Sequence, residues 1–453
     1  MGVAAGKFTR GIGQTSLAVP SDREDPVSMA LTCANKLLER YAVDPRLIGR
    51  LEIGTESMVD RSRSMKSYLV EHLFRPTGHS DLEGATCVMA CYGGTSALFN
   101  ALDWLRSGAA QGRLALVVMT DIARYGDPHA IPTMGAGALA VLLGPHAPVV
   151  FAPERASFWD CVDDFYKPLK EDEYPVVNSQ LSIHSYLRAV VETFLALHAK
   201  RPPLALQNFD FCLFHAPFAK MVQKAFTQLY YADQLLAHGA SDLTSRDCLL
   251  DGRKLAPVAK ECHSLFLEKC APGLALPKIV GNSYTASLYF GLVSLLADPA
   301  LQLPGKRVLF FSYGSGCAAS LFSAKMTAGC SALARKVRES LAELLASRIE
   351  ISPERLFLRK KEAETNYFRK GYVPEGSTGN LRNGVYFLES VDARYVRRYQ
   401  RKKERSGGSG SGGGGRGAER LRGVRAQLVG SESGASLWSG FHGKPLAERV
   451  DQV

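Results

Sequence analysis

Residues 86–95 read Thr-Cys-Val-Met-Ala-Cys-Tyr-Gly-Gly-Thr and precede a segment with helical periodicity. Apolar side chains recur in that segment at Ala97, Leu98, Ala101, Leu102 and Leu105, the pattern of a helix with one buried face. An apolar lead-in, a cysteine and two glycines place the thiol of Cys91 at a strand-to-helix turn. Because a helix N-terminus stabilises a thiolate, we expect a lowered pKa and a nucleophilic Cys91. The alternative is a buried structural cysteine, a common role for this residue type.

The composition is that of a globular protein with one basic end. The 453 residues are 46% hydrophobic and 22% charged, which suits a large core or two similar lobes. The net charge is +11, yet eleven Lys or Arg lie between Arg394 and Arg425 against two Glu. The basic character therefore belongs to the C-terminal end, and we expect no nucleic-acid partner. Residues 406–417 are almost pure Gly and Ser, so residues 406–453 are expected to form a disordered tail after a body of residues 1–405.

Three absences narrow the class of protein further. No apolar run reaches the roughly 18 residues that a membrane span requires, and the N-terminus lacks the apolar core of a signal peptide. The ten cysteines contain no Cys-x-x-Cys pair, which favours reduced thiols over disulfides or zinc. We therefore expect a cytoplasmic protein without a metal site.

The body is predicted to alternate strands and helices. Buried strands are expected at residues 51–55, 114–120, 136–143, 209–214, 308–311 and 317–324, and helices at 219–229, 285–297 and 331–348. Residues 112–142 and 306–321 each contain a basic residue, a buried strand, a glycine and a second strand. This weak repeat predicts two similar α/β halves, of about residues 1–165 and 166–405, although two ordinary hairpins would look alike.

Three residues could assist an acyl-accepting thiol, which needs a base, a group that polarises a carbonyl and donors for an oxyanion. Glu56 ends a strand, and a carboxylate in an apolar cleft has a raised pKa that suits proton abstraction. His215 stands between a buried strand and a helix, and Ser315 lies between two glycines. Each also has a structural explanation, as an exposed acid, a hydrogen-bonded core histidine or a plain turn.

Lys220 and Lys224 are four residues apart and share one face of a predicted helix. They could bind phosphates together, but such pairs are usually solvated helix faces. Neither a Gly-x-x-x-x-Gly-Lys-Ser/Thr motif nor a Gly-x-Gly-x-x-Gly motif follows a strand, so a kinase or dehydrogenase is not expected. Phosphates would have to be bound by lysines, as in coenzyme A recognition.

Together these segments closely resemble the eukaryotic 3-hydroxy-3-methylglutaryl-CoA synthases, condensing enzymes of the thiolase superfamily. The matching stretches are residues 50–56, 90–95, 164–168, 222–224, 281–285 and 311–316, and the likeness runs from about residue 6 to residue 399. The resemblance implies a thiolase-like α/β fold of two similar halves, layered α/β/α/β/α. It also implies a homodimer of the isoprenoid pathway that uses coenzyme A thioesters and no metal or redox cofactor.

The resemblance assigns roles to matching residues. Cys91 would be acetylated by acetyl-CoA, and Glu56 would be the base that takes a proton from the acetyl methyl group. His215 would bind and polarise the ketone of acetoacetyl-CoA. Substrate or coenzyme A contacts are implied for Thr133, Ser182, Lys220, Lys224, Asn282 and Ser315, and a supporting role for Asp121 and Asp164.

The chain departs from the family at several positions. Met89 and His129 stand where the family has Asn, Ile131 where it has Arg, and Ala216 and Phe218 where it has Ser and Tyr. These changes bear on substrate affinity and rate. Family members also begin earlier, with a strand expected to be central in the first half. We therefore expect this chain to lack that first strand and to leave backbone groups unpaired, with an incomplete gene model favoured over a truncated protein.

Three hypotheses compete. The leading one is a synthase that condenses acetyl-CoA with acetoacetyl-CoA. The second is a ketoacyl synthase of the initiating type, but that class lacks a base glutamate, so Glu56 argues against it. The third is an inactive homologue or a protein whose basic tail binds RNA or membranes, with salt-sensitive binding as its signature.

Overall fold

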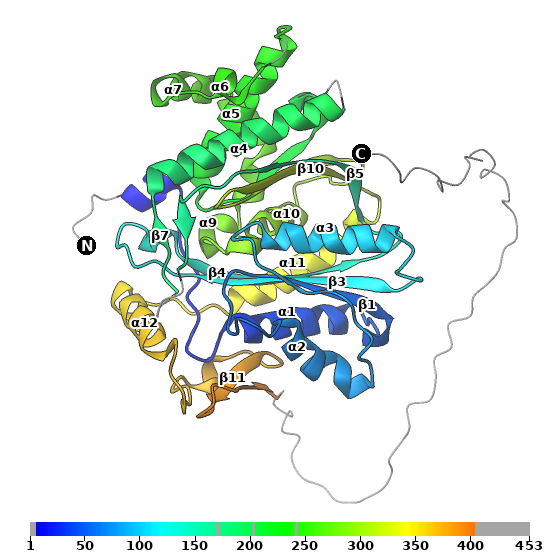
Figure 1. Ribbon diagram of the computed structural model, residues 1–453, viewed down its shortest axis with the longest axis vertical. Coiled ribbons are helices and arrows are strands. Elements are labelled where there is room, and N and C mark those ends of the chain that lie inside the picture. The colour runs from blue at the N-terminus through cyan, green and yellow to red at the C-terminus, as the bar shows by residue number, and fades with distance from the viewer. Residues whose placement is uncertain (1–5, 169–172, 202–203, 241–242, 404–453) are drawn as a thin grey trace, which may run out of the picture. The chain divides into compact units, whose positions relative to one another are not determined.

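Two four-stranded sheets form the frame of the computed structural model, which describes residues 6–168, 173–201, 204–240 and 243–403. The first sheet has the order β2-β1-β3-β4 and the second the order β5-β10-β9-β8. Their bounds are β1 (Ile48–Gly54), β2 (Thr86–Cys87), β3 (Leu114–Ala123), β4 (Gly135–Leu143), β5 (Val149–Trp159), β8 (Phe211–Phe214), β9 (Arg307–Gly314) and β10 (Ala318–Met326). Figure 1 shows helices between the sheets and on their outer sides, which confirms the predicted layered α/β fold. The predicted tail, residues 406–453, lies outside the described residues.

The two sheets repeat one topology. In the first, β1 runs parallel to β3, which pairs antiparallel with β4. In the second, β8 runs parallel to β9, which pairs antiparallel with β10. The two hairpins with similar sequences are therefore structurally equivalent. It follows that Glu56, two residues after β1, and His215, directly after β8, lie in the loops that follow equivalent strands of the two halves.

Alternating side chains of the central strands pack into separate cores on the two faces of each sheet. Inner residues of β3, β8 and β9 pack around α3 (Gly93–Arg106) and α10 (Ser287–Ala297) between the sheets. Outer residues of the first sheet pack against α1 (Pro26–Arg40). Those of the second pack against α4 (Ser179–Lys200) and α5 (Ala219–Ala237). Because both faces are covered, these strands read as continuous apolar runs in the sequence.

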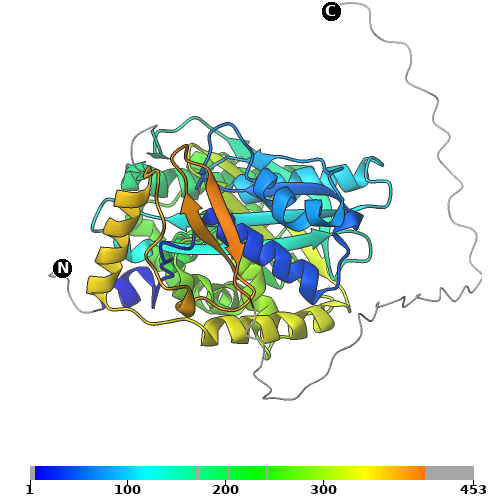
Figure 2. The same ribbon diagram turned by 90° about the horizontal axis from the view of Figure 1, so that it is seen from below.

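The boundary between the halves differs from the prediction. β5 pairs with β10, so the second sheet begins at Val149 rather than near residue 166. The C-terminal hairpin of β11 (Tyr386–Val391) and β12 (Arg397–Arg401) returns to the first half. There the Leu388 N–H donates to the Arg23 carbonyl (2.8 Å) and the Tyr386 N–H to the Thr32 hydroxyl (2.9 Å). Figure 2 shows this hairpin (orange) nearest the viewer, in front of α1.

The first sheet has no gap in its middle. Each of its four strands is paired with the next, from β2 through β1 and β3 to β4. The expectation of a missing central strand is therefore wrong in its position, because a further strand could pair only with an edge strand, β2 or β4.

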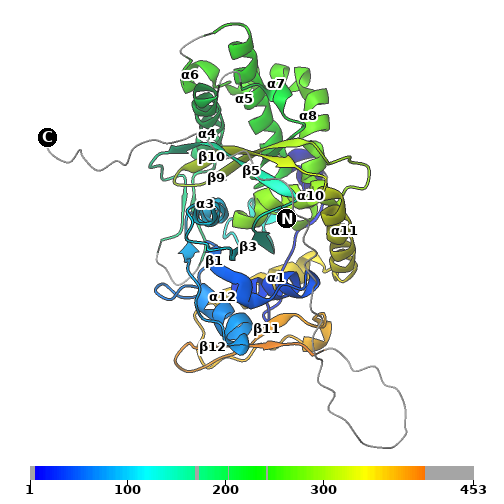
Figure 3. The same cartoon turned by 90° about the vertical axis from the view of Figure 1, so that its right-hand side faces the viewer.

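The remaining elements lie around this frame. They are α2 (Lys66–Leu69), β6 (Phe165–Tyr166), β7 (Val176–Val177), α6 (Ser245–Cys248), α7 (Gly252–Glu261), α8 (His263–Lys269), α9 (Pro277–Val280), α11 (Cys330–Ala346) and α12 (Pro353–Asn366). Figure 3 shows α6 and α7 at one end of the body and the β11–β12 hairpin at the other. In the described part of the chain, no helix combines the length and the apolar character needed to cross a membrane.

Candidate active site

Cys91 and Glu56 meet where two elements of the first half end. Glu56 follows β1, and Cys91 lies two residues before α3. The Cys91 Sγ is 3.9 Å from Oε2 of Glu56, so the thiol can donate to the carboxylate. The Glu56 side chain is only 5% exposed. Burial raises its pKa to about 7, with Lys167 opposing the rise, so the carboxyl can both accept and release a proton near neutral pH.

The glycines beside Cys91 permit a close approach of three segments. A Cβ on Gly94 would lie 2.6 Å from the Thr285 carbonyl oxygen, and a Cβ on Gly54 would overlap the Gly94 backbone. The end of β1, the start of α3 and the turn before α10 therefore pack backbone against backbone. This contact explains the unusual glycine pair in the sequence, and it brings Glu56 to Cys91.

Asp121 holds the loop that carries Glu56. Its Oδ1 accepts four hydrogen bonds of 2.8–3.0 Å, from the Thr55 hydroxyl, the Glu56 N–H, and the N–H and hydroxyl of Ser57. Its Oδ2 accepts from the N–H (3.0 Å) and the hydroxyl of Thr285. The carboxylate is fully buried, and that burial raises its pKa. Asp121 thus fixes the base from β3 and does not face the thiol as a second base.

Lys167 is a further partner of Glu56. Its Nζ lies 3.2 Å from Oε1 of Glu56, the carboxylate oxygen that does not face Cys91. The same ammonium group sits 4.6 Å from the ring centroid of Tyr284. Attraction to Glu56 and nearby carboxylates outweighs burial and raises the pKa of Lys167, so it stays charged. A permanent cation beside the base favours the ionised form of Glu56.

The predicted lowering of the Cys91 pKa is wrong for this structure. The thiol stands outside the first turn of α3, which begins at Gly93. Burial, and then the carboxylates of Glu56 and Asp121, raise the pKa of Cys91 well above its ordinary value. The resting group is therefore a thiol, and it needs a base to become a nucleophile.

His215 lies at the end of β8 and is buried. Burial lowers its pKa to about 3, so the imidazole is neutral at physiological pH. Its backbone is fixed on both sides: its N–H donates to the Phe311 carbonyl (2.9 Å), and the Tyr186 hydroxyl donates to its carbonyl (2.6 Å). The Nδ1 atom has no hydrogen-bond partner among the described residues. A neutral imidazole in this place can donate or accept one hydrogen bond but carries no charge.

Ser315 is in the loop between β9 and β10, next to the cysteine segment. A Cβ on Gly314 would lie 2.6 Å from the Met89 carbonyl oxygen and 2.7 Å from the Tyr92 nitrogen. Asp164 holds this loop, because its carboxylate accepts from the Gly316 N–H (3.0 Å) and the Tyr313 hydroxyl (3.2 Å). The sequence pointed to both Ser315 and Asp164, and the structure joins them.

Thr133 and Asn282 lie next to each other. The Asn282 N–H donates to the Thr133 carbonyl (3.2 Å), and the Asn282 amide donates to the Tyr125 hydroxyl (3.1 Å). Tyr125 belongs to a small apolar cluster with Ile131, against which Cys91 packs. The departure at Ile131 thus places an apolar side chain in the cluster against which Cys91 packs, whereas His129 is exposed.

Three residues that were expected to contact the ligand make no described contact with the residues around Cys91. They are Ser182, Lys220 and Lys224. Ser182 is in the first turn of α4, where its N–H donates to the Asn178 carbonyl (2.9 Å). Lys220 is exposed in the first turn of α5, where it donates to Gln223 (3.0 Å), and Lys224 is half-buried one turn later. Among the described residues, no group of three or more His, Cys, Asp or Glu is arranged to hold a metal ion.

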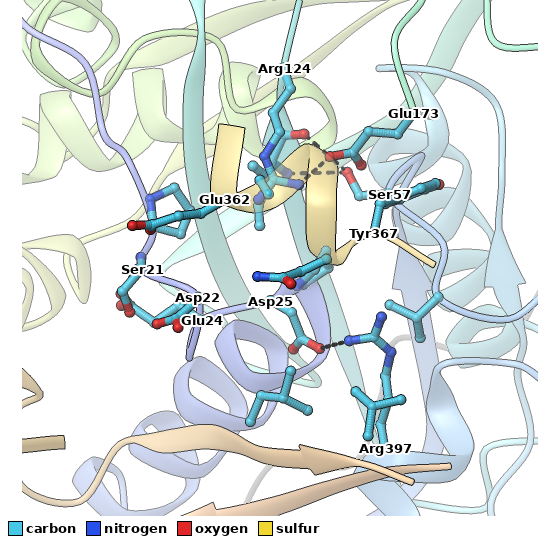
Figure 4. A pocket seen from close by; sticks show the side chains of 18 of the residues that line it. Ser21, Asp22, Glu24, Asp25, Ser57, Arg124, Glu173, Glu362, Tyr367 and Arg397 are labelled. Carbon is cyan, nitrogen blue, oxygen red and sulfur yellow. Dashed lines mark hydrogen bonds and ion pairs between the residues drawn. The ribbon is translucent and has the colours of Figure 1, made fainter. Parts of the chain in front are cut away.

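A cavity of about 90 Å³ lies behind the loop that carries Glu56 and does not include Cys91 or His215 in its lining. Figure 4 shows Ser57 from that loop at its wall, with Arg124 facing Glu173 and Asp25 facing Arg397. Both of these pairs are ion pairs, the second at 3.0 Å. The lining holds three arginines against five carboxylates, so the cavity is net acidic. Residues of the C-terminal hairpin and of the body line it together, apart from the thiol site.

Lys167 and Thr285 are the functional candidates that the sequence analysis did not single out. Lys167 belongs to the stretch at residues 164–168, and Thr285 to that at residues 281–285, which were used only for their family likeness. Their roles depend on contacts across more than a hundred residues, 167 with 56 and 285 with 121, which local sequence does not display.

Comparisons with known proteins bear on the family of the whole chain. The profile described as "Hydroxymethylglutaryl-coenzyme A synthase N terminal" matches residues 1–148, and the corresponding C-terminal profile matches residues 149–402. The chain is 40% identical over 417 residues to hydroxymethylglutaryl-CoA synthase A of Dictyostelium discoideum, covering 88% of this chain and 86% of that protein. It is 40% identical over 429 residues to the erg13A synthase of Aspergillus fumigatus, covering 89% and 91%.

A solved structure shares the fold as well. It is that of MvaS in complex with 3-hydroxy-3-methylglutaryl coenzyme A, with a TM-score of 0.78, 31% identity and coverage of 89% of this chain and 93% of that one. Two repeated α/β halves around a half-buried cysteine are the frame of a thiolase-like condensing-enzyme fold. Within that class, the chain belongs to the hydroxymethylglutaryl-CoA synthase family, as the sequence resemblance predicted.

Proposed function

We propose that this chain is an acyltransferase that condenses acetyl-CoA with acetoacetyl-CoA through an acetyl group on Cys91. The observation that carries the proposal is the contact between Cys91 and Glu56, 3.9 Å from sulfur to carboxylate oxygen. It joins a thiol that needs a base to a carboxyl whose pKa is about 7. Catalysis by a base is efficient when its pKa lies near the working pH.

In the first step the thiol becomes a nucleophile only as it reacts. Glu56 takes the thiol proton while the Cys91 sulfur attacks the acetyl carbonyl carbon of acetyl-CoA. The new S–C bond forms, the bond to the coenzyme A sulfur breaks, and the proton leaves with the released thiol of coenzyme A. Glu56 returns to its carboxylate form, ready for a second proton.

In the second step Glu56 removes a proton from the methyl group of acetyl-Cys91. The resulting carbanion forms a carbon–carbon bond with the ketone carbon of acetoacetyl-CoA. Because His215 is neutral, it polarises the ketone oxygen by donating a hydrogen bond and does not act as a cation. The alkoxide then takes the proton held by Glu56, and the base is restored.

In the last step water cleaves the thioester between the product and Cys91. One oxygen of the new carboxyl group comes from water, and the sulfur regains a proton. The Ser315 loop, held by Asp164 against the cysteine segment, is placed to offer backbone N–H groups to the oxyanion of both acyl steps. The product is 3-hydroxy-3-methylglutaryl-CoA, released with free coenzyme A.

Coenzyme A recognition is assigned to α5. Lys220 is exposed and Lys224 half-buried on one face of this helix, which suits them to bind phosphates. Thr133 and Asn282 are assigned to the substrate acyl chain, because they adjoin the apolar cluster beside Cys91. Ser182 is assigned to the substrate by family likeness alone. The same likeness supports a cytoplasmic homodimer, which sedimentation of the purified protein and cell fractionation would test.

Acetyl transfer to one named thiol tests the proposal. Incubation with radiolabelled acetyl-CoA should label Cys91, and Cys91→Ser should abolish the stable label. Cys87→Ser is the matched control, since this half-buried thiol lies four residues away and should leave labelling intact. Glu56→Gln should lose condensation when acetoacetyl-CoA is added. A folded wild-type protein that takes no label would contradict the proposal.

A further inference from the structure

Four large apolar side chains lie exposed together at the turn of the β11–β12 hairpin. Tyr395 and Val396 belong to the turn and are 55% and 37% exposed, and Phe368 and Val373 follow α12 and are 46% and 63% exposed. With the neighbouring cations Arg369, Lys370, Arg394 and Arg398, we call these residues the hairpin patch. Clustered exposed apolar side chains, unlike scattered ones, mark interaction surfaces.

Backbone hydrogen bonds join the two segments of the hairpin patch. Tyr372 and Val391 exchange N–H to carbonyl bonds of 2.8 and 2.7 Å, and the Gly371 N–H donates to the Asp392 carbonyl (3.1 Å). Lys370 also places its Nζ 6.0 Å from the ring centroid of Tyr395. The segment after α12 therefore runs alongside the hairpin turn, and the apolar side chains of both form one surface.

The turn presents its aromatic side chain at a conformational cost. Tyr395 has φ +62°, a left-handed conformation that is unfavourable for a bulky residue. The Asp392 carboxylate stabilises the turn, because it accepts the N–H groups of Arg394 (2.8 Å) and Val396 (2.9 Å). The turn therefore holds the Tyr395 ring in its exposed position.

The cations of the hairpin patch form no salt bridge with any carboxylate of the described residues. Some exposed arginines elsewhere on the body are paired, as Arg75 is with Glu71 (2.8 Å) and Arg46 with Asp44 (2.7 Å). The nearby acids are Asp392, which is engaged with the turn, and the exposed Glu375. Four cations against these two carboxylates leave a net positive, apolar surface.

We propose that the hairpin patch binds the surface of a membrane that carries anionic lipids. Valine and phenylalanine side chains gain free energy by entering the headgroup boundary, while Arg and Lys are attracted to the negative lipid charge. A nucleic-acid backbone would attract the cations but would leave Val373 and Val396 without a partner. Figure 2 shows the hairpin as an outermost element, so a flat surface can reach it.

Sedimentation with vesicles tests the proposal on the full chain. The probe is a phosphatidylcholine vesicle with about 30% phosphatidylserine, compared with phosphatidylcholine alone. The wild type should bind the mixed vesicles, and Arg394→Gln with Arg398→Gln should weaken binding about tenfold or more. Tyr395→Asn with Val396→Ser should also weaken it several-fold. Because Asn tolerates a positive φ, this variant should keep the wild-type melting temperature.

Matched controls lie at the opposite end of the body in Figure 3. Arg253→Gln with Lys254→Gln on α7 removes two exposed cations, and Leu267→Ser on α8 removes an apolar side chain that is 52% exposed. Both should leave vesicle binding unchanged. The basic residues after 403 are present in every variant, so their attraction to lipid is constant. Equal losses of vesicle binding in the patch and control variants would overturn the proposal. A protein that binds RNA but not vesicles, and keeps its RNA binding in the Tyr395→Asn, Val396→Ser variant, would overturn it as well.

Discussion

The ammonium group of Lys167 lies 3.2 Å from Oε1 of Glu56, while the Cys91 sulfur faces Oε2 of the same carboxylate. Burial and the Asp121 charge raise the pKa of Glu56, and Lys167 lowers it. The value of about 7 is the balance of these opposing effects. Burial and the Asp121 charge on one side, and the Lys167 charge on the other, thus set the pH at which Glu56 can work as a base.

Removal of the Lys167 charge should move this balance. In Lys167→Met the pKa of Glu56 rises, so the acid limb of kcat/KM should shift upward by ~1 pH unit or more. Activity should be low at neutral pH and recover in alkaline buffer. Lys167→Arg keeps the cation and should stay near the wild-type profile. An unchanged acid limb in Lys167→Met would show that Lys167 does not act on the base.

Asp121→Asn should loosen the base and also change its titration. The Asn amide nitrogen cannot accept the two hydrogen bonds that Thr285 donates to Oδ2, so unfolding should become easier by about 2 kcal/mol or more. Loss of the negative charge should move the acid limb of kcat/KM to lower pH, because Asp121 raises the pKa of Glu56. Denaturation curves and a pH profile measure the two effects. A limb that moves upward would contradict this account.

Glu56→Gln should abolish condensation yet stabilise the fold at alkaline pH. The folded-state pKa of about 7 exceeds the unfolded value of 4.5, so the folded chain holds the proton more tightly. This contribution is present below pH 4.5 and is lost as the pH rises through 7. At pH 8 the free energy of unfolding of the variant should therefore exceed that of the wild type by about 3 kcal/mol. Near pH 4.5 the two free energies should agree. Chemical denaturation at both pH values measures the difference.

Gly94→Ala should disturb the junction of β1, α3 and the turn at Thr285. The added Cβ would lie 2.6 Å from the Thr285 carbonyl oxygen, and backbone must move to relieve the overlap. We expect a loss of about 1–3 kcal/mol in unfolding free energy together with a lower rate of Cys91 acetylation. Gly252→Ala is the matched control, because a Cβ there meets no atom within 4 Å. Equal stability of the two variants would refute the close-contact explanation.

Much of the frame could be predicted because its strands read as continuous apolar runs, and the central ones are buried on both faces. The runs at residues 114–120 and 136–143 became β3 and β4 with ends within three residues of the prediction. Packing of the β11–β12 hairpin against α1 could not be predicted, since it depends on contacts such as Leu388 with Arg23 across the length of the chain.

The site shows the same division between local and distant information. Motifs identified Cys91, Glu56 and His215, because each stands at the end of a recognisable strand or beside a distinctive turn. The predicted lowering of the Cys91 pKa was wrong because it rested only on the helix that follows the cysteine. Burial, and then the negative charges of Glu56 and Asp121, raise the pKa of the thiol, and these effects appear only when the strands are packed together.

The placement of Glu56 and His215 after equivalent strands carries a consequence for the origin of the site. The loop after the parallel strand β1 bears a proton acceptor, and the loop after its counterpart β8 bears a neutral imidazole. Two identical copies would have offered two bases or two imidazoles, and neither pair performs both tasks. Joining the halves in one chain lets matched positions specialise independently, so the chemistry is asymmetric although its framework is duplicated.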